Sequence, residues 1–304
     1  MMMRAQEAPL KHFEPGIFGN MNSDPKVLVV TLYSGENEYE ACTKSVKQQV
    51  GVDIVHRVIE FLPKQEAHQK LYQMFNENRQ EFSYFAKLDA DMEFSSPKSL
   101  KNILTQFSAG VDVVSATVHD GMTNSDIQSF NVFSSRCYFH YEVNDPLFTD
   151  QLKIDYPGRQ YSYVDPERNV LHAFNPSPFQ AFMFGVHRAL KVVQPGVRVP
   201  SLNNSYHQRV ILNQTYQFWL KTKSEHLEYA LWGATLVFQH AINSPQLFQK
   251  SDYNDVFDEV CAKGGVPIDS RLSKSDLLSL VKIIGFGRFS VGIFDQALKK
   301  VKLK

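Results

Sequence analysis

KVLVVTLYSGENEYEACTKSVKQQ, residues 26–49, joins a strand pattern to a helix pattern. Its β-branched run ends at Ser34, before a glycine, which is typical of a strand giving way to a loop. Tyr39, Cys42 and Val46 then follow at the three-to-four-residue spacing of a helix face. Glutamates precede and begin this helix, where its dipole favours negative charge. A strand followed by a helix is the first unit of an α/β fold.

The same alternation continues along the chain. Further strands are predicted at 52–61, 82–88 and 111–118, and further helices at 64–79 and 96–107. Alternation of this kind predicts a mostly parallel, mixed sheet sandwiched between helices.

The rest of the chain is less regular. Residues 119–180 are rich in aromatic residues, Pro and Asp, which predicts long loops over a binding face with an antiparallel pair among them. Segments 179–193 and 225–240 are apolar enough to return to the core. The predicted division is an N-terminal arm (1–25), an α/β domain (26–249) and a helical C-terminal extension (250–304).

Composition and charge narrow the class of protein. The chain has 304 residues, 43% of them hydrophobic, which is enough for a sizeable folded core. Lys plus Arg (32) equals Asp plus Glu (32), so no overall charge favours nucleic acid, and an anionic ligand needs a local site. Three widely spaced cysteines are typical of reduced thiols. With no signal-peptide pattern and no run of about 18 apolar residues, we expect a soluble cytoplasmic protein.

FAKLDADMEF, residues 85–94, places Asp89 and Asp91 directly after the predicted strand 82–88. In extended chain, residues two apart project to the same side, with Cα atoms about 6–7 Å apart. Both carboxylates can therefore address one cation, and hard oxygen ligands suit Mg²⁺ or Mn²⁺ bound to a diphosphate. The alternative is an ordinary turn with solvated or capping carboxylates, and spacing alone does not choose between them.

Together, VVTLYSGENEYEACTKSVKQQ and KLDADMEF resemble the nucleotide-sugar-dependent glycosyltransferases of the GT-A fold, particularly the family 2-like group. The resemblance covers about residues 26–118, and more loosely extends to about 245. Before Tyr33 the family's Pro is absent, Ser34 stands for Asn, and IEFLPKQEAH replaces the family's DDGS block. The chain therefore resembles a divergent member with a GT-A-like fold.

The resemblance also implies site residues. The family's metal-binding pair corresponds to Asp89 and Asp91, which implies Mn²⁺ or Mg²⁺ as the cofactor. Ser45 and Gln49 fit the Ser-x-x-x-Gln signature of the first helix. The implied donor-binding residues are Thr31, Tyr33, Ser34, Glu36, Asp89 and Ala90.

Further candidates lie later in the chain. His240 follows an apolar run, and the resemblance implies an additional metal ligand there; a core or surface histidine is the alternative. Glu225 and Glu228 fall where the family carries its catalytic base, although solvated glutamates at a helix N-terminus would have the same pattern. Asp120, just past the strand 111–118, is a rival base.

The predicted function is metal-dependent transfer of a sugar from a nucleotide-sugar donor, within glycan biosynthesis. Family habit implies a glycan, lipid-linked or polysaccharide acceptor. A phosphatase of the haloacid dehalogenase type, with Asp89 as nucleophile, is an alternative. Two strand–helix units precede the motif here, and Glu93 stands where that class has Thr or Val. A non-catalytic carbohydrate-binding protein is the other alternative, but it has no need of the acidic pair.

The C-terminus combines basic and apolar residues. Phe294 and three aliphatic residues alternate there with Lys299, Lys300, Lys302 and Lys304. Such a pattern predicts either a basic helix at an anionic membrane surface or a packed terminal helix with solvated lysines.

Overall fold

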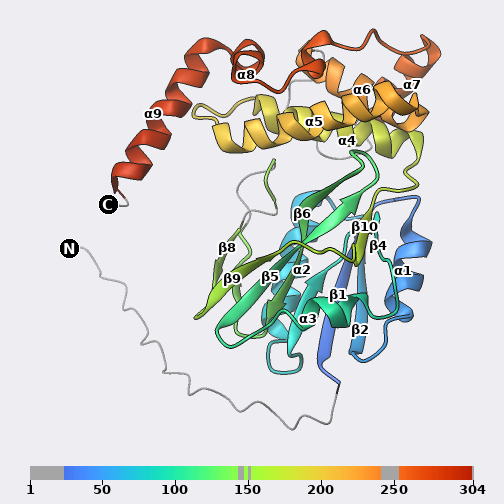
Figure 1. Ribbon diagram of the computed structural model, residues 1–304, viewed down its shortest axis with the longest axis vertical. Helices are drawn as coiled ribbons and strands as arrows, with labels where there is room; N and C mark the ends of the chain where they lie inside the picture. The colour runs from blue at the N-terminus through green and yellow to red at the C-terminus, as the bar shows by residue number, and fades with distance from the viewer. Residues whose placement is uncertain (1–23, 143–146, 150–151, 241–252, 303–304) are drawn as a thin grey trace.

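The computed structural model describes residues 24–142, 147–149, 152–240 and 253–302, and its centre is a mixed eight-stranded sheet (Figure 1). The strand order is β2-β1-β3-β6-β5-β10-β4, with β9 also paired to β5. Parallel pairs join β1 to β2 and β3, and β5 to β9 and β10, while β6 and β4 run antiparallel to their neighbours. The predicted mixed α/β class is confirmed. The strands are β1 (Lys26–Tyr33), β2 (Asp53–Glu60), β3 (Tyr84–Lys87), β4 (Met92–Phe94), β5 (Val111–Asp120), β6 (Ser125–Ser134), β9 (Arg159–Tyr163) and β10 (Val170–His172).

Two apolar layers cover the faces of this sheet. Side chains alternate along β1, so Val27 and Val29 face one side while Leu28 and Val30 face the other. On the first side α1 (Tyr39–Lys47) and α3 (Ser99–Leu104) pack on the sheet, and on the second α2 (Lys64–Glu77) does so. The hairpin of β7 (Tyr138–His140) and β8 (Lys153–Asp155) extends the second layer through Phe139.

A separate helical layer lies across one end of the sheet (Figure 1). Its helices share one hydrophobic cluster, distinct from the two clusters of the sheet. The helices α4 and α6 are in close contact because Gly185 and Gly233 have no Cβ. A Cβ at Gly185 would collide with the carbonyl oxygen of Ala230, and a Cβ at Gly233 with that of Phe182. The elements are α4 (Pro178–Val193), α5 (Leu202–Thr222), α6 (Glu225–Phe238), α7 (Asn254–Ala262), η2 (Ser270–Ser273), α8 (Leu277–Ile284) and α9 (Phe286–Lys302).

The helical layer starts at α4, well before residue 250, and it meets the sheet through a small cluster that includes Met122, Ala173 and Leu227. Most of the predicted arm (1–25) and the predicted boundary at 249 lie outside the described residues. The division into three segments therefore stays a prediction. The helix α5 was not predicted, because its apolar residues are not confined to one stripe.

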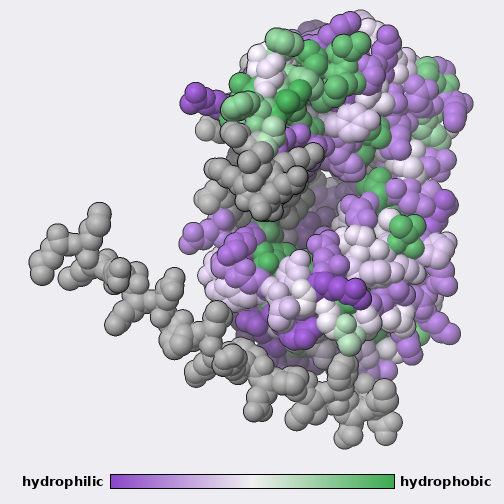
Figure 2. All heavy atoms as spheres, turned by 60° about the vertical axis from the view of Figure 1, so that its left-hand side comes forward, coloured by the Kyte–Doolittle hydropathy of each residue, from purple (hydrophilic) through white to green (hydrophobic). Residues whose placement is uncertain are grey.

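Apolar side chains also gather on the surface, and Figure 2 shows them on the upper part of the molecule, where α8 and α9 lie. Within the described residues, no single helix is long and apolar enough to cross a membrane. The pair Leu277–Ile284 and Phe286–Ala297 has the required length and composition when taken together, but it is bent by 115°.

Candidate active site

Strand ends bring the candidate residues together. The strands β1, β3, β5 and β10 are linked by the sheet so that their carboxyl ends share one edge, the usual ligand-binding edge of an open α/β sheet. Asp89 and Asp91 lie between β3 and β4, Asp120 ends β5 and His172 ends β10. Register partners of His172 are Asp120 on one side and Met92 on the other, so the histidine stands between the two acidic positions.

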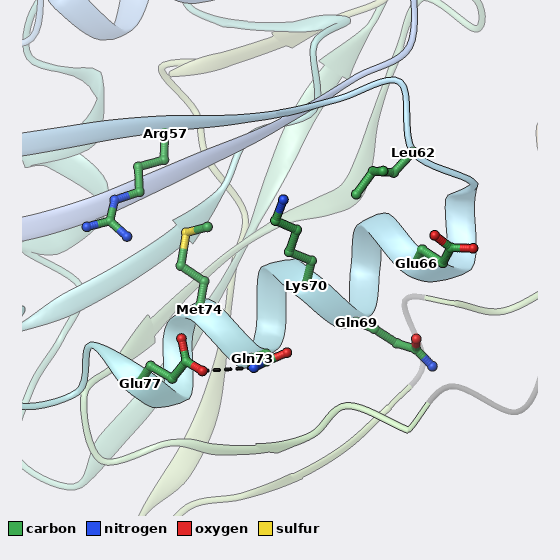
Figure 3. Close-up of a pocket in the computed structure, with 8 residues that line it drawn as sticks. All are labelled: Arg57, Leu62, Glu66, Gln69, Lys70, Gln73, Met74 and Glu77. Carbon is green, nitrogen blue, oxygen red and sulfur yellow. Dashed lines mark hydrogen bonds between the residues drawn. The ribbon is translucent and has the colours of Figure 1, made fainter.

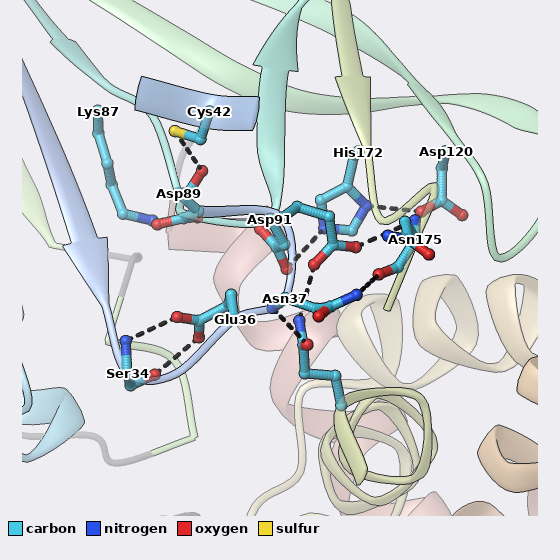
Figure 4. Close-up of polar contacts among 12 residues, drawn as sticks. Ser34, Glu36, Asn37, Cys42, Lys87, Asp89, Asp91, Asp120, His172 and Asn175 are labelled. Atoms are coloured by element: carbon cyan, nitrogen blue, oxygen red, sulfur yellow. Dashed lines mark hydrogen bonds and ion pairs between the residues drawn. The ribbon is translucent and has the colours of Figure 1, made fainter. Parts of the chain in front are cut away.

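These residues form a chain of carboxylate, imidazole and carboxylate (Figure 4). Nε2 of His172 lies 3.4 Å from Oδ2 of Asp91, and Nδ1 of His172 lies 2.6 Å from Oδ1 of Asp120. Thr123 donates a hydrogen bond of 2.5 Å to the other oxygen of Asp120. Side-chain exposure rises from 0% at Asp120 to 10% at His172 and 30% at Asp91, so only Asp91 opens substantially to solvent.

The two carboxylates keep His172 protonated. Burial by itself would lower the pKa of His172, but the charges of Asp91 and Asp120 and their hydrogen bonds outweigh it and raise the pKa to about 10. Burial likewise opposes ionisation of Asp120, yet the hydrogen bond and charge of His172 lower the pKa of Asp120 below its ordinary value. The buried Asp120 is therefore engaged on both oxygens, by Thr123 and His172, and its role as a base stays a prediction.

Asp89 points elsewhere. Figure 4 shows its carboxylate turned toward Lys87, whose Nζ lies 2.8 Å from Oδ2, while Asp91 is turned toward His172. The main chain of Asp89 is held by a contact of 3.7 Å from Sγ of Cys42 to the carbonyl oxygen. The two aspartates thus have separate cationic partners, although they leave the same loop.

A pocket of about 290 Å³ opens beside Asp91. Two sides are formed by the loop after β1 with the start of α1 and by the strand ends of β4 and β10. None of its lining residues is Lys or Arg, so carboxylates dominate its charge. The lining residues are Asn37, Glu38, Glu40, Ala41, Asp91, Met92, Glu93, Leu171, His172, Ala173, Phe174 and Asn175.

A hydrogen-bond network ties the first loop to the start of α4. Gln180 accepts from the backbone N–H of Asn37 at 2.7 Å and donates to Glu38 at 2.9 Å. Asn175 donates from its backbone to Glu38 at 3.2 Å and accepts from the Asn37 side chain at 2.8 Å. The capping box of Ser177 and Gln180 fixes the helix start that carries this network. Burial raises the pKa of Glu38, against the opposing hydrogen bond of Gln180.

The predicted nucleotide loop carries an aromatic cluster. Tyr33 stacks on Tyr39 with ring centroids 4.0 Å apart, and meets the edge of Phe61 at 5.1 Å. Phe61 is 68% exposed and directly follows β2. Glu36 folds back onto Ser34 and accepts its backbone N–H at 2.6 Å and its hydroxyl at 2.7 Å.

Two predicted donor-binding residues are buried. Thr31 is fully buried and bonds Nε2 of His56 at 2.9 Å inside the sheet layer. Ala90 is also fully buried and donates its backbone N–H to the carbonyl of Leu32 at 3.3 Å. Neither lines the pocket beside Asp91.

The candidates on α6 lie at different distances from the pocket. Leu227, in the first turn of α6, packs with Met122 and Ala173, so this turn borders the site. Glu228 is half-buried in the same turn, and the exposed Glu225 accepts a hydrogen bond of 2.6 Å from Tyr229. At about 1.5 Å per residue, His240 lies about 20 Å further along the helix axis, so the structure does not bring it to the aspartates.

A larger hollow of about 470 Å³ lies between β2 and α2 (Figure 3). Its polar lining carries both signs of charge and includes Arg57, Lys70 and Glu66. None of the predicted site residues lines it, and it is remote from the paired strand ends that carry Asp91 and His172. The chemistry therefore points to the smaller pocket.

No protein-family model matches the sequence, and no curated protein matches it. Similar solved structures include the mannosyltransferase PcManGT from Pyrobaculum calidifontis in complex with GDP-Man and Mn²⁺, at 12% identity, 88% coverage of each chain and a TM-score of 0.41. Another is TarS 1–349 of S. aureus, at 12% identity, covering 79% of this chain and 92% of that chain, with a TM-score of 0.33. With TM-scores below 0.5, these likenesses do not decide the fold, which is described above from this chain's own strand order and pairing.

A divalent cation fits the donor set of the pocket. An anionic diphosphate would meet carboxylates and no Lys or Arg among the lining residues, so a cation is needed to balance the charge. Carboxylate oxygens are the ligands that Mg²⁺ and Mn²⁺ prefer. No cluster of three or more His, Cys, Asp or Glu side chains suited to a metal occurs in the described part of the chain. Mg²⁺ is commonly held by one or two carboxylates with substrate phosphates and water, and Asp91 is the aspartate of the pair that lines the pocket.

Sequence reasoning missed His172 and Phe174. His172 closes the short apolar run of β10, the same local signal that drew attention to His240. Residues 119–180 have no regular pattern that would single out this histidine. Phe174, 51% exposed, lines the pocket two residues beyond His172.

Proposed function

We propose that this chain is a glycosyltransferase that moves a sugar from a nucleotide-sugar donor to an acceptor hydroxyl, with Mn²⁺ or Mg²⁺ held by Asp91 and Asp89. The observation that carries the proposal is the acidic pocket at the carboxyl edge of the sheet, where Asp91 is backed by His172 and Asp120. Its volume of about 290 Å³ lies at the small end of ligand pockets, which suits a sugar unit with its phosphate.

The aromatic cluster after β1 and β2 supports a place for the nucleobase. Tyr33 and Tyr39 present stacked rings, and Phe61 offers a largely exposed ring beside them. Bases bind aromatic faces by stacking, which does not require the acidic block that the chain lacks. The loop from Ser34 to Glu38 then leads from this cluster to the pocket.

The charge of the leaving diphosphate is the main electrostatic demand of glycosyl transfer. When bound, a divalent cation offsets this charge. His172, protonated between two carboxylates, holds Asp91 in one orientation, and Asp120 holds the imidazole in turn. Residues that hydrogen-bond a metal-ligating carboxylate keep it in place and tune its affinity for the metal.

Glu38 is the best-placed proton acceptor for the attacking hydroxyl. It lines the pocket, and its burial raises its pKa, which makes the carboxylate a stronger proton acceptor. Gln180 and the backbone of Asn175 fix its orientation. Glu228, the predicted base, borders the site but is not among the residues that line the pocket.

For the acceptor, the exposed ring of Phe174 at the pocket offers an apolar surface on which a sugar face can stack. This ring supports a glycan, a polysaccharide or the sugar of a lipid-linked intermediate as acceptor. The predicted phosphatase alternative gains no comparable support, because two strand–helix units, β1 with α1 and β2 with α2, precede the aspartates, whereas that class carries its motif at the end of the first strand.

Thermal unfolding with UDP-, GDP- and dTDP-sugars, each with and without Mn²⁺, tests the proposal together with release of nucleoside diphosphate. We expect one donor class to raise the unfolding temperature only with Mn²⁺, and the same donor to be turned over. Asp155→Asn, which removes an exposed carboxylate from the β7–β8 hairpin, is the matched control for Asp91→Asn and should keep both effects. A free sugar that raises the unfolding temperature, with no such effect from a nucleotide, would instead indicate a carbohydrate-binding protein. Phosphate release from a sugar phosphate would indicate a phosphatase.

A further inference from the structure

The helices α8 and α9 expose an unusual share of the large apolar side chains. Six of the fifteen exposed large hydrophobic residues in the described part of the chain fall between 277 and 294. The most exposed are Phe286 at 76%, Leu278 at 74% and Phe294 at 67%. We name this surface the apolar ridge, and it consists of Leu277, Leu278, Phe286, Val291, Ile293 and Phe294.

The ridge is the outward face of helices that are firmly packed on their other side. Leu280, Ile283 and Ile284 of α8 belong to the core of the helical layer, while Leu277 and Leu278 of the same helix are exposed. The buried residues of α8 hold this helix on the core, so the exposed Leu277 and Leu278 are not needed to keep it in place.

Contacts of α9 define its inward face equally clearly. Arg288 donates to the carbonyls of Val193, Gln194 and Val197 at 2.9, 2.6 and 3.0 Å, and so anchors α9 at the end of α4. Phe289 is buried, and Gly292 lies so close to Leu202 that a Cβ there would collide with it. With these residues turned inward, Phe286, Ile293 and Phe294 are left in solvent.

Charge indicates which partner covers the ridge. Residues 277–304 carry six basic residues and one acidic residue, a net charge of +5 in a chain whose total is zero, so the remainder carries −5. A segment that combines exposed apolar side chains with a net positive charge matches a surface that has an apolar interior under anionic groups, which is the surface of an anionic bilayer. A second copy would place the same positive charges against each other across a symmetric contact.

The geometry favours lying on a bilayer over crossing it. Neither α8, with 8 residues, nor α9, with 17, provides the roughly 20 apolar residues of a span, and the bend of 115° prevents the two from forming one straight rod. Both helices are also fixed to the protein by their inward faces. We propose that the apolar ridge docks the protein on the surface of an anionic lipid bilayer, independently of whether the proposed glycosyl transfer is correct.

Vesicle sedimentation of the full chain tests this directly. We compare phosphatidylcholine vesicles with vesicles that contain phosphatidylglycerol, at low and high salt, for the wild type and for Phe286→Ser with Phe294→Ser. We expect binding to anionic vesicles at low salt, a strong decrease at high salt, and at least about tenfold weaker partitioning of the double variant. Both side chains are largely exposed, so circular dichroism and the unfolding temperature should stay at wild-type values.

Leu220→Ser, which removes an exposed apolar side chain from α5, is the matched control and should bind vesicles as the wild type does. A charge variant, Lys282→Gln on the exposed face of α8, should weaken binding to anionic vesicles only. Equal sedimentation of wild type and double variant, or no vesicle binding at low salt, would overturn the proposal. A self-association that the double variant abolishes, without vesicle binding, would also overturn it and assign the ridge to a second copy.

Discussion

His172 and Asp120 are direct partners across the parallel pairing of β10 and β5, and their facing atoms, Nδ1 and Oδ1, lie 2.6 Å apart. Fifty-two residues separate them along the chain, so the contact exists only because the two strands are neighbours. This contact sets the ring plane of His172, and through it the orientation of Asp91 at the pocket.

We predict that Asp120→Ala lowers the free energy of unfolding by about 3–5 kcal/mol, because it leaves a buried, charged imidazole without its better partner. Urea unfolding measures the change. Asp155→Ala is the matched control: it breaks a His–Asp contact of the same 2.6 Å length with His140, but on the exposed hairpin. Solvent screens that pair, so its loss should leave stability close to wild type. Similar effects in both variants would contradict the role of burial.

For the cation, we predict a difference between the two aspartates. Asp91→Asn should weaken Mn²⁺ binding, measured by electron paramagnetic resonance, by more than the roughly 10–100-fold typical of losing an outer partner. Asp89→Asn should have a smaller effect, because its carboxylate is paired with Lys87 and does not line the pocket. Wild-type Mn²⁺ affinity in Asp91→Asn would remove the proposed metal site.

Replacing Phe61 by Ala should weaken nucleotide binding by about 1–3 kcal/mol, the usual value of an aromatic ring stacked on a base. The ring is exposed beside Tyr33, so the substitution should not disturb the fold. Calorimetric titration with the nucleoside diphosphate measures the effect, and Tyr206→Ala, an exposed ring on α5, is the control. Equal affinity in all three proteins would place the base elsewhere.

The Glu38→Gln variant should keep nucleotide affinity but lose about 10²–10⁴-fold in kcat, since an amide cannot accept the proton of the attacking hydroxyl. Glutamine preserves the shape of the side chain, but its NH2 group replaces one of the two oxygens that accept from Asn175 and Gln180, so one of these hydrogen bonds is lost. Glu228→Gln provides the comparison, with a much smaller loss expected because it does not line the pocket. A large loss in Glu228→Gln with an active Glu38→Gln would return the role of base to α6.

Stability should also decrease in acid through Asp269. Burial opposes its ionisation, but hydrogen bonds from Arg271 outweigh this and lower the pKa of Asp269 in the folded state. A carboxylate with a lowered folded pKa stabilises the protein above its unfolded pKa, and this contribution is lost as pH falls through the folded pKa. Urea unfolding at pH 7, 5, 4 and 3 should therefore show a shallower acid decrease in Asp269→Asn. A decrease as steep as in the wild type would show that Asp269 contributes little.

The strands β1, β2, β3 and β5 and the helices α1, α2 and α3 could be predicted because their signals are local. Alternating apolar residues in β1 and the helical spacing in α1 are properties of short stretches, and each is independent of the rest of the chain. The position of Asp89 and Asp91 after an apolar strand was likewise visible without a structure. By contrast α5, whose apolar residues surround much of the helix, has no local signal and is defined by the helices that pack on it.

The comparison of His172 with His240 shows what the sequence alone determined and what only the tertiary structure decided. His172 and His240 each end an apolar run, so local sequence cannot rank them. The sequence determined that strands would deliver carboxylates to one edge, because strand formation and the Asp-x-Asp spacing are local. Only the placement of β10 between β5 and β4 brought His172 to Asp120 and Asp91, whereas the direction of α6 carried His240 away from them. Strand order depends on the packing of the whole sheet, and no short segment of the chain contains that information.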